Sequence, residues 1–267
     1  MDEPALLSRI ARAASLLVAT DFDGTISDIA TDPDKAHARN DALDALSRLT
    51  RAPGVHVAVV SGRTMESLHE RTGALASIYR VAEHGAFIEG PDGGTIGGTH
   101  PGRAAGRSAL WDFVEANHAR VPGMRFERKS VGAAVHVREV EPAMREAAAE
   151  VLDAFRKAAV AAGFEIIEGR QVVEARDPGA TKQTALAQLL ARLPPRTLVV
   201  YAGDDTTDEG AIALARQRDG VGIYVASAER PTPNVGADLV LPGPRAWAEL
   251  LARIADARAA ITARSGP

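Results

Sequence analysis

The chain has 267 residues, 46% of them hydrophobic, with a formal net charge of −4 and no cysteine. Its length allows a large buried core in one or two compact units, and the nearly balanced charge argues against a broad basic face for nucleic acid. The absence of cysteine excludes disulfides and thiolate metal sites. No apolar run approaches the ~18 residues of a membrane span, and the first residues are acidic where a secretory signal is basic. We therefore expect a soluble cytoplasmic protein without a membrane partner, and a monomer by default.

The first predicted strand, 16–19, runs through Thr20 into Asp21-Phe22-Asp23-Gly24-Thr25. Two carboxylates one residue apart at the end of a buried strand repel each other and are costly to desolvate. A hard divalent cation such as Mg2+ removes this cost, because it prefers carboxylate oxygens and water. The junction is therefore a candidate metal site in which one carboxylate is available as a nucleophile. The alternative is a hairpin turn at Asp23-Gly24.

Two further strands in the first third of the chain end in polar residues. A helix is predicted at about 40–50, and the strand that follows it, 55–60, is nearly all apolar, as expected for a strand covered on both faces of a parallel sheet. This strand ends at Ser61, which is suited either to hold a phosphate or to cap the next helix. A third strand, 78–82, ends at Glu83-His84-Gly85. Ligands bind at such carboxyl ends in open α/β sheets.

The middle of the chain follows a different pattern. Its Gly- and Pro-rich start, 90–102, predicts a linker or a hairpin. The order helix, strand, strand then occurs twice, which indicates antiparallel pairs with helices on one face. The predicted elements are a helix at about 104–119 with strands at 124–127 and 133–137, then a helix at about 142–162 with strands at 164–167 and 171–174. We interpret this region as an α+β insertion into an α/β domain that resumes near Pro178.

The last part of the chain returns to the first pattern. Lys182 opens a helix predicted at 184–193, where a cation opposes the helix dipole unless an anion lies nearby; the alternative is a solvated lysine. A strand at 198–202 runs into the segment 203–209, which has four acids in seven residues. These acids either complete a metal site or are helix N-terminal charges that the dipole favours. The elements predicted after them are strands at 221–225 and 238–241 and a helix at about 244–262.

Together these segments offer one candidate for each role in phosphoryl transfer through a carboxylate. Asp21 is the candidate nucleophile and Asp23 the acid/base, while Thr25 is placed to donate to the phosphate or to orient Asp23. The candidates for holding the phosphate are Ser61 and Lys182. The metal site that begins at Asp21 and Asp23 would be completed by Asp204, with Asp205 or Asp208.

These motifs, in this order, resemble the haloacid-dehalogenase superfamily of phosphatases, and within it the chain is most similar to the trehalose-6-phosphate phosphatases. The resemblance extends from about Leu16 to Leu241 and is carried by 21–25, 61–63, His84-Gly85, Lys182 and 203–209, with Glu127, Lys129, His136 and Arg138 in the middle. It implies an α/β fold in which a Rossmann-like core with a parallel sheet, at 1–96 and 178–267, carries an inserted α+β cap domain of the C2B type, at 97–177.

The resemblance also implies Mg2+-dependent hydrolysis of trehalose 6-phosphate, a small sugar phosphate, through an aspartyl-phosphate. The catalytic residues it implies are Asp21, Asp23, Thr25, Ser61 and Lys182. The metal site it implies consists of Asp21, the Asp23 backbone carbonyl and Asp204, with Asp205 and Asp208 in support. Sugar hydroxyls would be bound by Arg63, His84, Glu127, Lys129 and Glu174, of which the carboxylates each accept two hydrogen bonds. From the residues alone, the cap charges are equally well explained as exposed strand charges.

Three alternatives remain at this point. One is a phosphatase for another sugar phosphate, such as sucrose phosphate or a glucosyl- or mannosyl-3-phosphoglycerate. The second is a sugar phosphomutase with a similar cap, which must keep water from the transferred group. The third is a non-catalytic sugar-phosphate sensor, which is expected to lack Asp21 or Asp23, whereas both are present. Fold alone does not decide among them.

Overall fold

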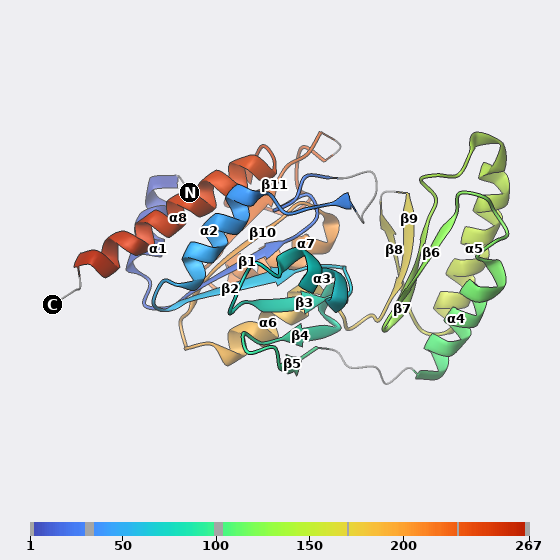
Figure 1. The fold of residues 1–267 in the computed structure, drawn as a ribbon, viewed down its shortest axis with the longest axis horizontal. Helices are drawn as coiled ribbons and strands as arrows, with labels where there is room; N and C mark the ends of the chain where they lie inside the picture. The colour runs from blue at the N-terminus through green and yellow to red at the C-terminus, as the bar shows by residue number, and fades with distance from the viewer. Residues whose placement is uncertain (1–2, 30–34, 99–103, 170, 229, 265–267) are drawn as a thin grey trace. The chain divides into compact units, whose positions relative to one another are not determined.

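The computed structural model describes residues 3–29, 35–98, 104–169, 171–228 and 230–264 (Figure 1). The chain divides into two compact units. The core unit consists of Met1–Gly98 and Thr181–Pro267, and the inserted unit of Thr99–Ala180. The sequence prediction places the two boundaries at 96/97 and 177/178. The inserted unit thus interrupts the core unit in sequence, between two segments that fold together.

In the described part of the chain, the core unit forms an eight-stranded sheet in the order β12-β11-β10-β1-β2-β3-β4-β5. The strands are β1 (Leu16–Asp21), β2 (Val55–Val60), β3 (Tyr79–Ala82), β4 (Phe87–Glu89), β5 (Thr95–Gly97), β10 (Leu198–Gly203), β11 (Val221–Val225) and β12 (Leu239–Leu241). Neighbours from β12 to β3 pair in parallel, and β4 and β5 are antiparallel. Central β1 and β10 are buried along their whole length, which explains their continuous apolar sequence.

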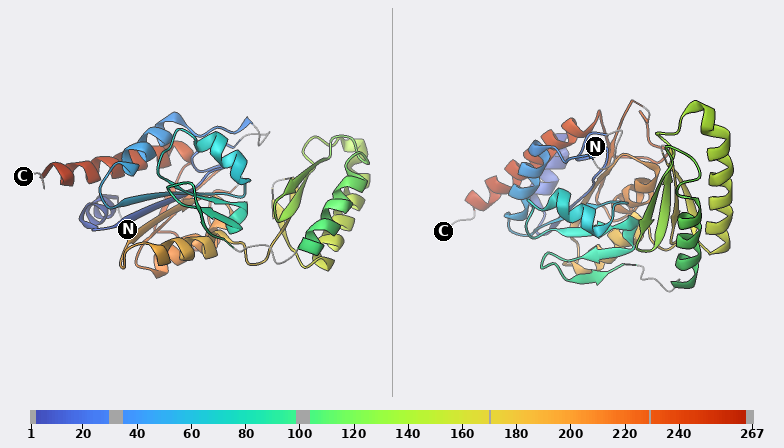
Figure 2. Two further views of the ribbon diagram at one scale, coloured as in Figure 1. Left: turned by 60° about the horizontal axis from the view of Figure 1, so that its bottom comes forward. Right: turned by 45° about the vertical axis from the view of Figure 1, so that its right-hand side comes forward.

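Helices cover both faces of this sheet (Figures 1 and 2). They are α1 (Glu3–Arg12), α2 (Asn40–Thr50), α3 (Met65–Thr72), α6 (Lys182–Arg192), α7 (Thr206–Gln217) and α8 (Pro244–Arg264), with a 3-10 turn, η2 (Glu83–Gly85). One apolar layer joins the sheet to α1, α2 and α8 and includes Leu46 and Trp247. The other joins it to α6 and α7 and includes Leu186 and Ile212. All four side chains are fully buried, and full burial of a Leu or Ile side chain stabilises by roughly 1.5–3 kcal/mol.

At one edge of the sheet, the structure has the hairpin that was predicted as the alternative to a linker, together with two short strands that were not predicted. The Gly-rich segment lies partly in a hairpin, in which β4 and β5 flank a turn closed by the Gly90 N–H donating to the Gly94 carbonyl at 2.8 Å. Two strands of three residues are too short to produce a periodic signal in the sequence. The rest of the predicted linker, 99–103, lies outside the described residues.

The inserted unit is a four-stranded antiparallel sheet, in the order β6-β7-β9-β8 within the described residues, with two helices on one face (Figure 2). Its elements are α4 (Ala104–Asn117), β6 (Arg125–Lys129), β7 (Gly132–His136), η3 (Pro142–Met144), α5 (Arg145–Ala161), β8 (Glu165–Gly169) and β9 (Val172–Arg176). Val135 and Val173 pair across β7 and β9 and pack with Phe155 of α5. Alternation along the strands therefore turns Glu127 and Glu174 to the opposite face.

Parallel strands bring the polar segments of the core unit to one edge of its sheet. Thr20 is in register with Val59 of β2 and Ala202 of β10. The residues that follow these strands therefore emerge side by side, next to the end of β3. No helix among the described residues combines the length and hydrophobicity that a membrane span needs.

Candidate active site

Asp21 is the last residue of β1 and is buried, with 4% of its surface exposed. The chain turns sharply after it, because the N–H groups of Ile26 and Ser27 both donate to the Phe22 carbonyl at 3.0 Å. Gly24 has a φ of +78°, and a Cβ there would lie 2.2 Å from Asp204 Oδ2, so only glycine fits. The turn therefore brings the Asp204 carboxylate against the loop that follows Asp21. Thr25 Oγ1 lies 3.5 Å from Asp21 Oδ2, at the limit of a hydrogen bond.

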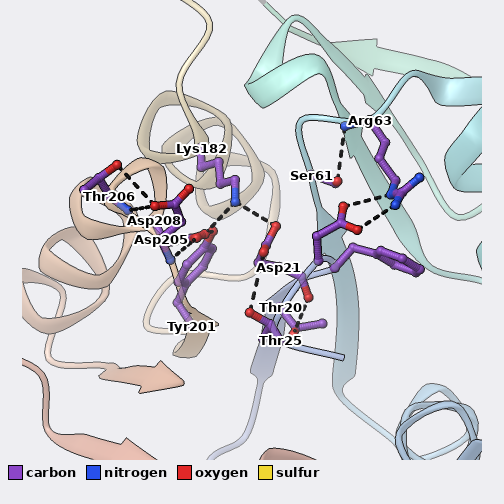
Figure 3. Close-up of polar contacts among 12 residues, drawn as sticks. Thr20, Asp21, Thr25, Ser61, Arg63, Lys182, Tyr201, Asp205, Thr206 and Asp208 are labelled. Atoms are coloured by element: carbon purple, nitrogen blue, oxygen red, sulfur yellow. Dashed lines mark hydrogen bonds and ion pairs between the residues drawn. The ribbon is translucent and has the colours of Figure 1, made fainter. Parts of the chain in front are cut away.

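Lys182, the first residue of α6, extends a buried ammonium to two carboxylates (Figure 3). Its Nζ donates to Asp21 Oδ1 at 2.7 Å and to Asp208 Oδ1 at 2.8 Å. Burial alone would lower the pKa of Lys182, but the Asp208 and Asp21 carboxylates raise it above its ordinary value. The ammonium therefore stays charged at the start of a helix, where the dipole opposes it. Pairing with the carboxylates of Asp21 and Asp208 explains why a cation is found at this position.

Asp21, Asp204 and Asp208 form a buried acidic cluster in the core unit. One carboxylate oxygen from each lies within 4.8 Å of the others. Burial raises the pKa of Asp21 well above its ordinary value; Lys182 opposes this rise, and the Asp208 and Asp204 carboxylates add to it. Three carboxylates facing one ammonium leave an excess of negative charge, and hard oxygen ligands suit a divalent cation. The cluster is thus able to bind a metal.

Asp23 is held by Arg63, which follows β2. Arg63 Nε donates to Asp23 Oδ2 at 2.8 Å, and Nη2 donates to Oδ1 at 2.6 Å. The guanidinium carbon lies 5.1 Å from the centroid of the Phe22 ring, in a cation–π contact. The side chain of Arg63 is 8% exposed and that of Asp23 is 46% exposed. The candidate acid/base is therefore oriented by a buried cation and accessible from one side.

Ser61 and His84 lie together in a strained pair of turns. The His84 N–H donates to the Ser61 carbonyl at 3.0 Å, and the Glu83 N–H donates to the Arg63 carbonyl at 2.9 Å. Glu83 and His84 have φ angles of 47° and 59°, a left-handed conformation that costs non-glycine residues of order 1–3 kcal/mol. A Cβ on Gly62 would lie 2.5 Å from His84 Nε2, so the imidazole rests against this glycine. The strained turn thus fixes the imidazole beside the buried Ser61.

Asp205 and Asp208, the two acids of the 203–209 segment that were predicted to support the metal site, differ in their contacts. Asp205 caps α7, accepts from the Thr206 N–H at 2.7 Å, and pairs with Arg230 at 2.6 Å. Asp208 is fully buried and accepts from Lys182, from the Tyr201 hydroxyl at 2.6 Å, and from the Asp205 N–H at 3.2 Å. Burial and the Asp208 carboxylate raise the pKa of Tyr201 well above its ordinary value, so its hydroxyl remains a donor. Both acids therefore also organise the start of α7.

The predicted sugar-binding residues of the inserted unit lie on the sheet face away from its helices. Glu127 of β6 and Glu174 of β9 are both in register with Ala134 of β7. Lys129 Nζ pairs with Glu174 Oε1 at 2.7 Å, and His136 Nε2 with Glu127 Oε2 at 3.0 Å. Burial would raise the pKa of Glu127, but the hydrogen bond from His136 and the charge of Lys129 lower it overall. This face therefore carries a set of paired charges that hold one another in place.

A sequence profile of the family described as trehalose-phosphatase matches residues 19–244. The chain belongs to the trehalose-phosphatase family. Within this family it is 38% identical over 216 residues to the bifunctional trehalose-6-phosphate synthase/phosphatase of Thermoproteus tenax, covering 79% of this chain and 29% of that protein. It is 34% identical over 247 residues to the trehalose-phosphate phosphatase of Mycobacterium tuberculosis, covering 88% and 60%. The chain thus spans less than two thirds of either relative.

Solved structures show the same fold for this trehalose-phosphatase family member. The C-terminal domain of the C. albicans trehalose-6-phosphate phosphatase has a TM-score of 0.80 at 21% identity and covers 96% of this chain and 97% of its own. A haloacid dehalogenase-like hydrolase from B. subtilis has a TM-score of 0.58 at 16% identity, with 88% and 98% covered. These likenesses confirm the predicted class of α/β fold.

Three residues at these sites carry no site role in the sequence prediction. Tyr201 belongs to an apolar strand, and its polar tip is the one feature that distinguishes it there. His136 is part of the family resemblance, but its contact with Glu127 depends on strand register. Trp247, from α8, donates through Nε1 to Thr20 Oγ1 at 3.0 Å, and Thr20 Oγ1 donates to the Asp21 carbonyl at 2.9 Å. Trp247 and Thr20 lie 227 residues apart in the sequence, and periodicity gives no sign of their contact.

Proposed function

We propose that this chain is a phosphatase that hydrolyses trehalose 6-phosphate to trehalose and phosphate, with Mg2+ and through an aspartyl-phosphate on Asp21. The observation that carries the proposal is the buried ammonium of Lys182, hydrogen bonded to Asp21 and Asp208 beside Asp204. Such a site suits transfer of a phosphoryl group to a carboxylate. Membership of the trehalose-phosphatase family, and relatives bearing the name trehalose-phosphate phosphatase, support the choice of substrate.

In the first step, a carboxylate oxygen of Asp21 attacks phosphorus, and the bond from phosphorus to the sugar oxygen breaks. Asp23 gives its proton to that oxygen, so trehalose leaves as a neutral alcohol. Lys182 and Ser61 hold the phosphoryl oxygens, and Thr25 stays beside Asp21. Arg63 keeps Asp23 oriented at the end of β1, within reach of the leaving group.

In the second step, water attacks the phosphorus of the aspartyl-phosphate. Asp23, now a carboxylate, accepts a proton from this water, and the bond from phosphorus to the Asp21 oxygen breaks. Phosphate leaves, and Asp21 returns as a carboxylate while Asp23 is again protonated. The sum is trehalose 6-phosphate and water giving trehalose and phosphate, and one residue serves as acid and then as base.

The residues that would hold Mg2+ are Asp21, the Asp23 backbone carbonyl and Asp204. The donor set fits, because it consists of oxygens and includes two of the carboxylates that converge within 4.8 Å. The bound ion would offset the negative charge that the phosphoryl group adds to this cluster. Asp208 supports the site through Lys182, and Asp205 through the start of α7.

The inserted unit is proposed to be the cap that selects the sugar. Glu127, Lys129 and Glu174 would bind sugar hydroxyls, because a carboxylate accepts several hydroxyl hydrogen bonds and an ammonium donates three. Arg63 and His84 would contribute from the core unit. The pairing of Lys129 with Glu174 supports this role, since paired charges on one sheet face present both donors and acceptors in fixed positions.

Phosphate release over a panel of substrates tests the proposal. The panel contains trehalose 6-phosphate, sucrose 6-phosphate, glucosyl-3-phosphoglycerate, glucose 6-phosphate and p-nitrophenyl phosphate, each with Mg2+ and with chelator. We expect Mg2+-dependent release with the highest kcat/KM for trehalose 6-phosphate, without a sugar-bisphosphate activator. A higher kcat/KM for another sugar phosphate would refute the substrate, and full activity with chelator would refute the metal.

A further inference from the structure

Tyr201 is a buried tyrosine whose hydroxyl reaches the acidic cluster from inside the core. It lies on β10 with no exposed surface, and its ring packs in the apolar layer that joins the sheet to α6 and α7. The hydroxyl donates to Asp208 Oδ1 at 2.6 Å (Figure 3). A phenylalanine would fill the same apolar space without a polar group to satisfy. The packing therefore needs the ring alone, and the hydroxyl serves the contact with Asp208.

The Asp208 carboxylate is fixed from three sides. Its Oδ1 accepts from Tyr201 and from Lys182 Nζ at 2.8 Å, and its Oδ2 accepts from the Asp205 N–H at 3.2 Å. It also lies on the backbone of Gly203, where a Cβ would be 2.2 Å from Asp208 Cγ. A carboxylate that accepts from β10, α6 and the start of α7, and that has no space on its remaining side, has one orientation available.

Lys182 depends on this carboxylate for its position. A lysine ammonium is a point charge on a flexible four-carbon stem, so its location follows its partners more than its own geometry. Within the described residues it has two such partners, Asp208 Oδ1 and Asp21 Oδ1 at 2.7 Å, and an ammonium has three donors. The third donor is the one suited to a phosphoryl oxygen beside Asp21.

We propose that Tyr201 is a positioning residue for phosphoryl transfer, acting through Asp208 on Lys182. The inference rests on the proposed function, in which Lys182 holds the phosphoryl oxygens. Tyr201 fixes the oxygen on which the ammonium rests, and so sets where that ammonium meets the group bound at Asp21. An oriented donor stabilises most strongly where charge develops in the reaction. Loss of the hydroxyl should therefore reduce the stabilisation of the transition state more than it reduces the affinity for substrate.

Tyr201→Phe tests this role, since it removes one hydroxyl and keeps the ring. We expect kcat to fall about tenfold, the scale of one hydrogen bond to a charged group, with KM changed less than about twofold. The loss should be equal for trehalose 6-phosphate and p-nitrophenyl phosphate, because Lys182 acts on the phosphoryl group that both share. A cooperative thermal unfolding transition, measured for the variant, serves as the check that it is folded. Asp208→Asn keeps the volume of the side chain but removes the charge that faces Lys182. It should give a larger loss of kcat, again with little change in KM.

Tyr224→Phe is the matched control. Tyr224 lies on the neighbouring strand β11, is 2% exposed and belongs to the same apolar layer. Its hydroxyl donates to the Arg230 backbone carbonyl at 3.2 Å and does not contact Asp208. Tyr224→Phe also removes a tyrosine hydroxyl from this apolar layer but leaves the contacts of Lys182 unchanged. We therefore expect kcat to stay within about twofold of wild type.

The outcomes separate the two claims. A wild-type enzyme that releases phosphate, with kcat of Tyr201→Phe unchanged, overturns the positioning role alone. Equal losses of kcat in Tyr201→Phe and Tyr224→Phe also overturn it, because they indicate a loosened layer. If Tyr201→Phe does not fold, an unchanged kcat in Asp208→Asn overturns the role instead. A folded wild-type protein that releases phosphate from no substrate overturns the proposed function, and the positioning role with it.

Discussion

Arg63 and Asp23 form a two-pronged ion pair that joins the residues after β2 to those after β1. Both oxygens of the carboxylate are engaged, at 2.6 and 2.8 Å, and the guanidinium stacks on Phe22. A planar guanidinium matches a carboxylate in this way, whereas a lysine ammonium does not. The orientation of the proposed acid/base is thus set by a residue from a separate motif, and this dependence is open to experiment.

Arg63→Lys keeps the positive charge but cannot form the two-pronged pair with Asp23. We expect kcat for trehalose 6-phosphate to fall roughly tenfold or more, because one charge-assisted hydrogen bond contributes about 1.5–3 kcal/mol. Arg39→Lys is the matched control, since Arg39 makes the same two-pronged pair with Asp41, at 3.1 and 3.0 Å, on the exposed start of α2. Equal kcat in Arg63→Lys and wild type would refute the orienting role.

Asp21→Asn should abolish turnover and leave the fold intact. Loss of a nucleophile costs roughly a thousandfold or more in kcat, and the change in volume is small. Burial already raises the pKa of Asp21, so folding without metal disfavours its charged form. The unfolding temperature in chelator should therefore be no lower than that of wild type. Asp28→Asn, at an exposed position in the same loop, should keep full turnover; substantial turnover by Asp21→Asn would refute the nucleophile.

Asp204→Asn should weaken metal binding. We expect the Mg2+ concentration for half-maximal activity to rise roughly 10–100-fold, because one of the proposed carboxylate ligands becomes a neutral amide. Titration calorimetry with Mg2+ and no substrate should show the same loss. Asp44→Asn, on the exposed side of α2, removes an equal charge elsewhere and should leave the half-maximal concentration unchanged. If both variants behave alike, Asp204 is not a ligand.

The paired charges of the inserted unit give a prediction about pH. Burial acts to raise the pKa of Glu127, but the hydrogen bond from His136 and the charge of Lys129 together hold this pKa below its ordinary 4.5. A lowered carboxyl pKa contributes stability above pH 4.5 that is lost as the pH falls through the lowered value. His136→Leu removes this hydrogen bond, so it should raise the Glu127 pKa, measured by carboxyl NMR, and move acid unfolding to higher pH. His118→Leu should change neither, because the exposed His118 ring contacts a backbone carbonyl and not Glu127.

The strands around the site were predictable from the sequence. Strands β1, β2 and β10 are covered on both faces, so each is a continuous apolar run that ends abruptly in polar residues. The polar residues that follow these strands were placed at one edge of the sheet, because the carboxyl ends of parallel strands meet there. Short β4 and β5 left no such signal, because three residues show no period.

The pairings within the site were not predictable in this way. The contact of Arg63 with Asp23 depends on the turn after each strand, and the contact of Tyr201 with Asp208 depends on where α7 begins. Asp205 and Asp208 are spaced as a helix cap and its third residue, which is the one local pattern that indicates their structural role. Tyr201 counts as apolar in any strand pattern, so its hydroxyl leaves no trace there.

Trp247 and Thr20 provide a last prediction, on stability. The indole N–H of Trp247 is fully buried and donates to Thr20 Oγ1 at 3.0 Å, which ties α8 to the end of β1. Thr20→Val removes the acceptor and leaves a buried donor without its partner, so it should lower the free energy of unfolding by about 1–3 kcal/mol in urea titrations. Trp247→Phe removes the donor and some volume. Because both variants break the same bond, the double variant should be less destabilised than the sum of the two, and strict additivity would contradict the coupling.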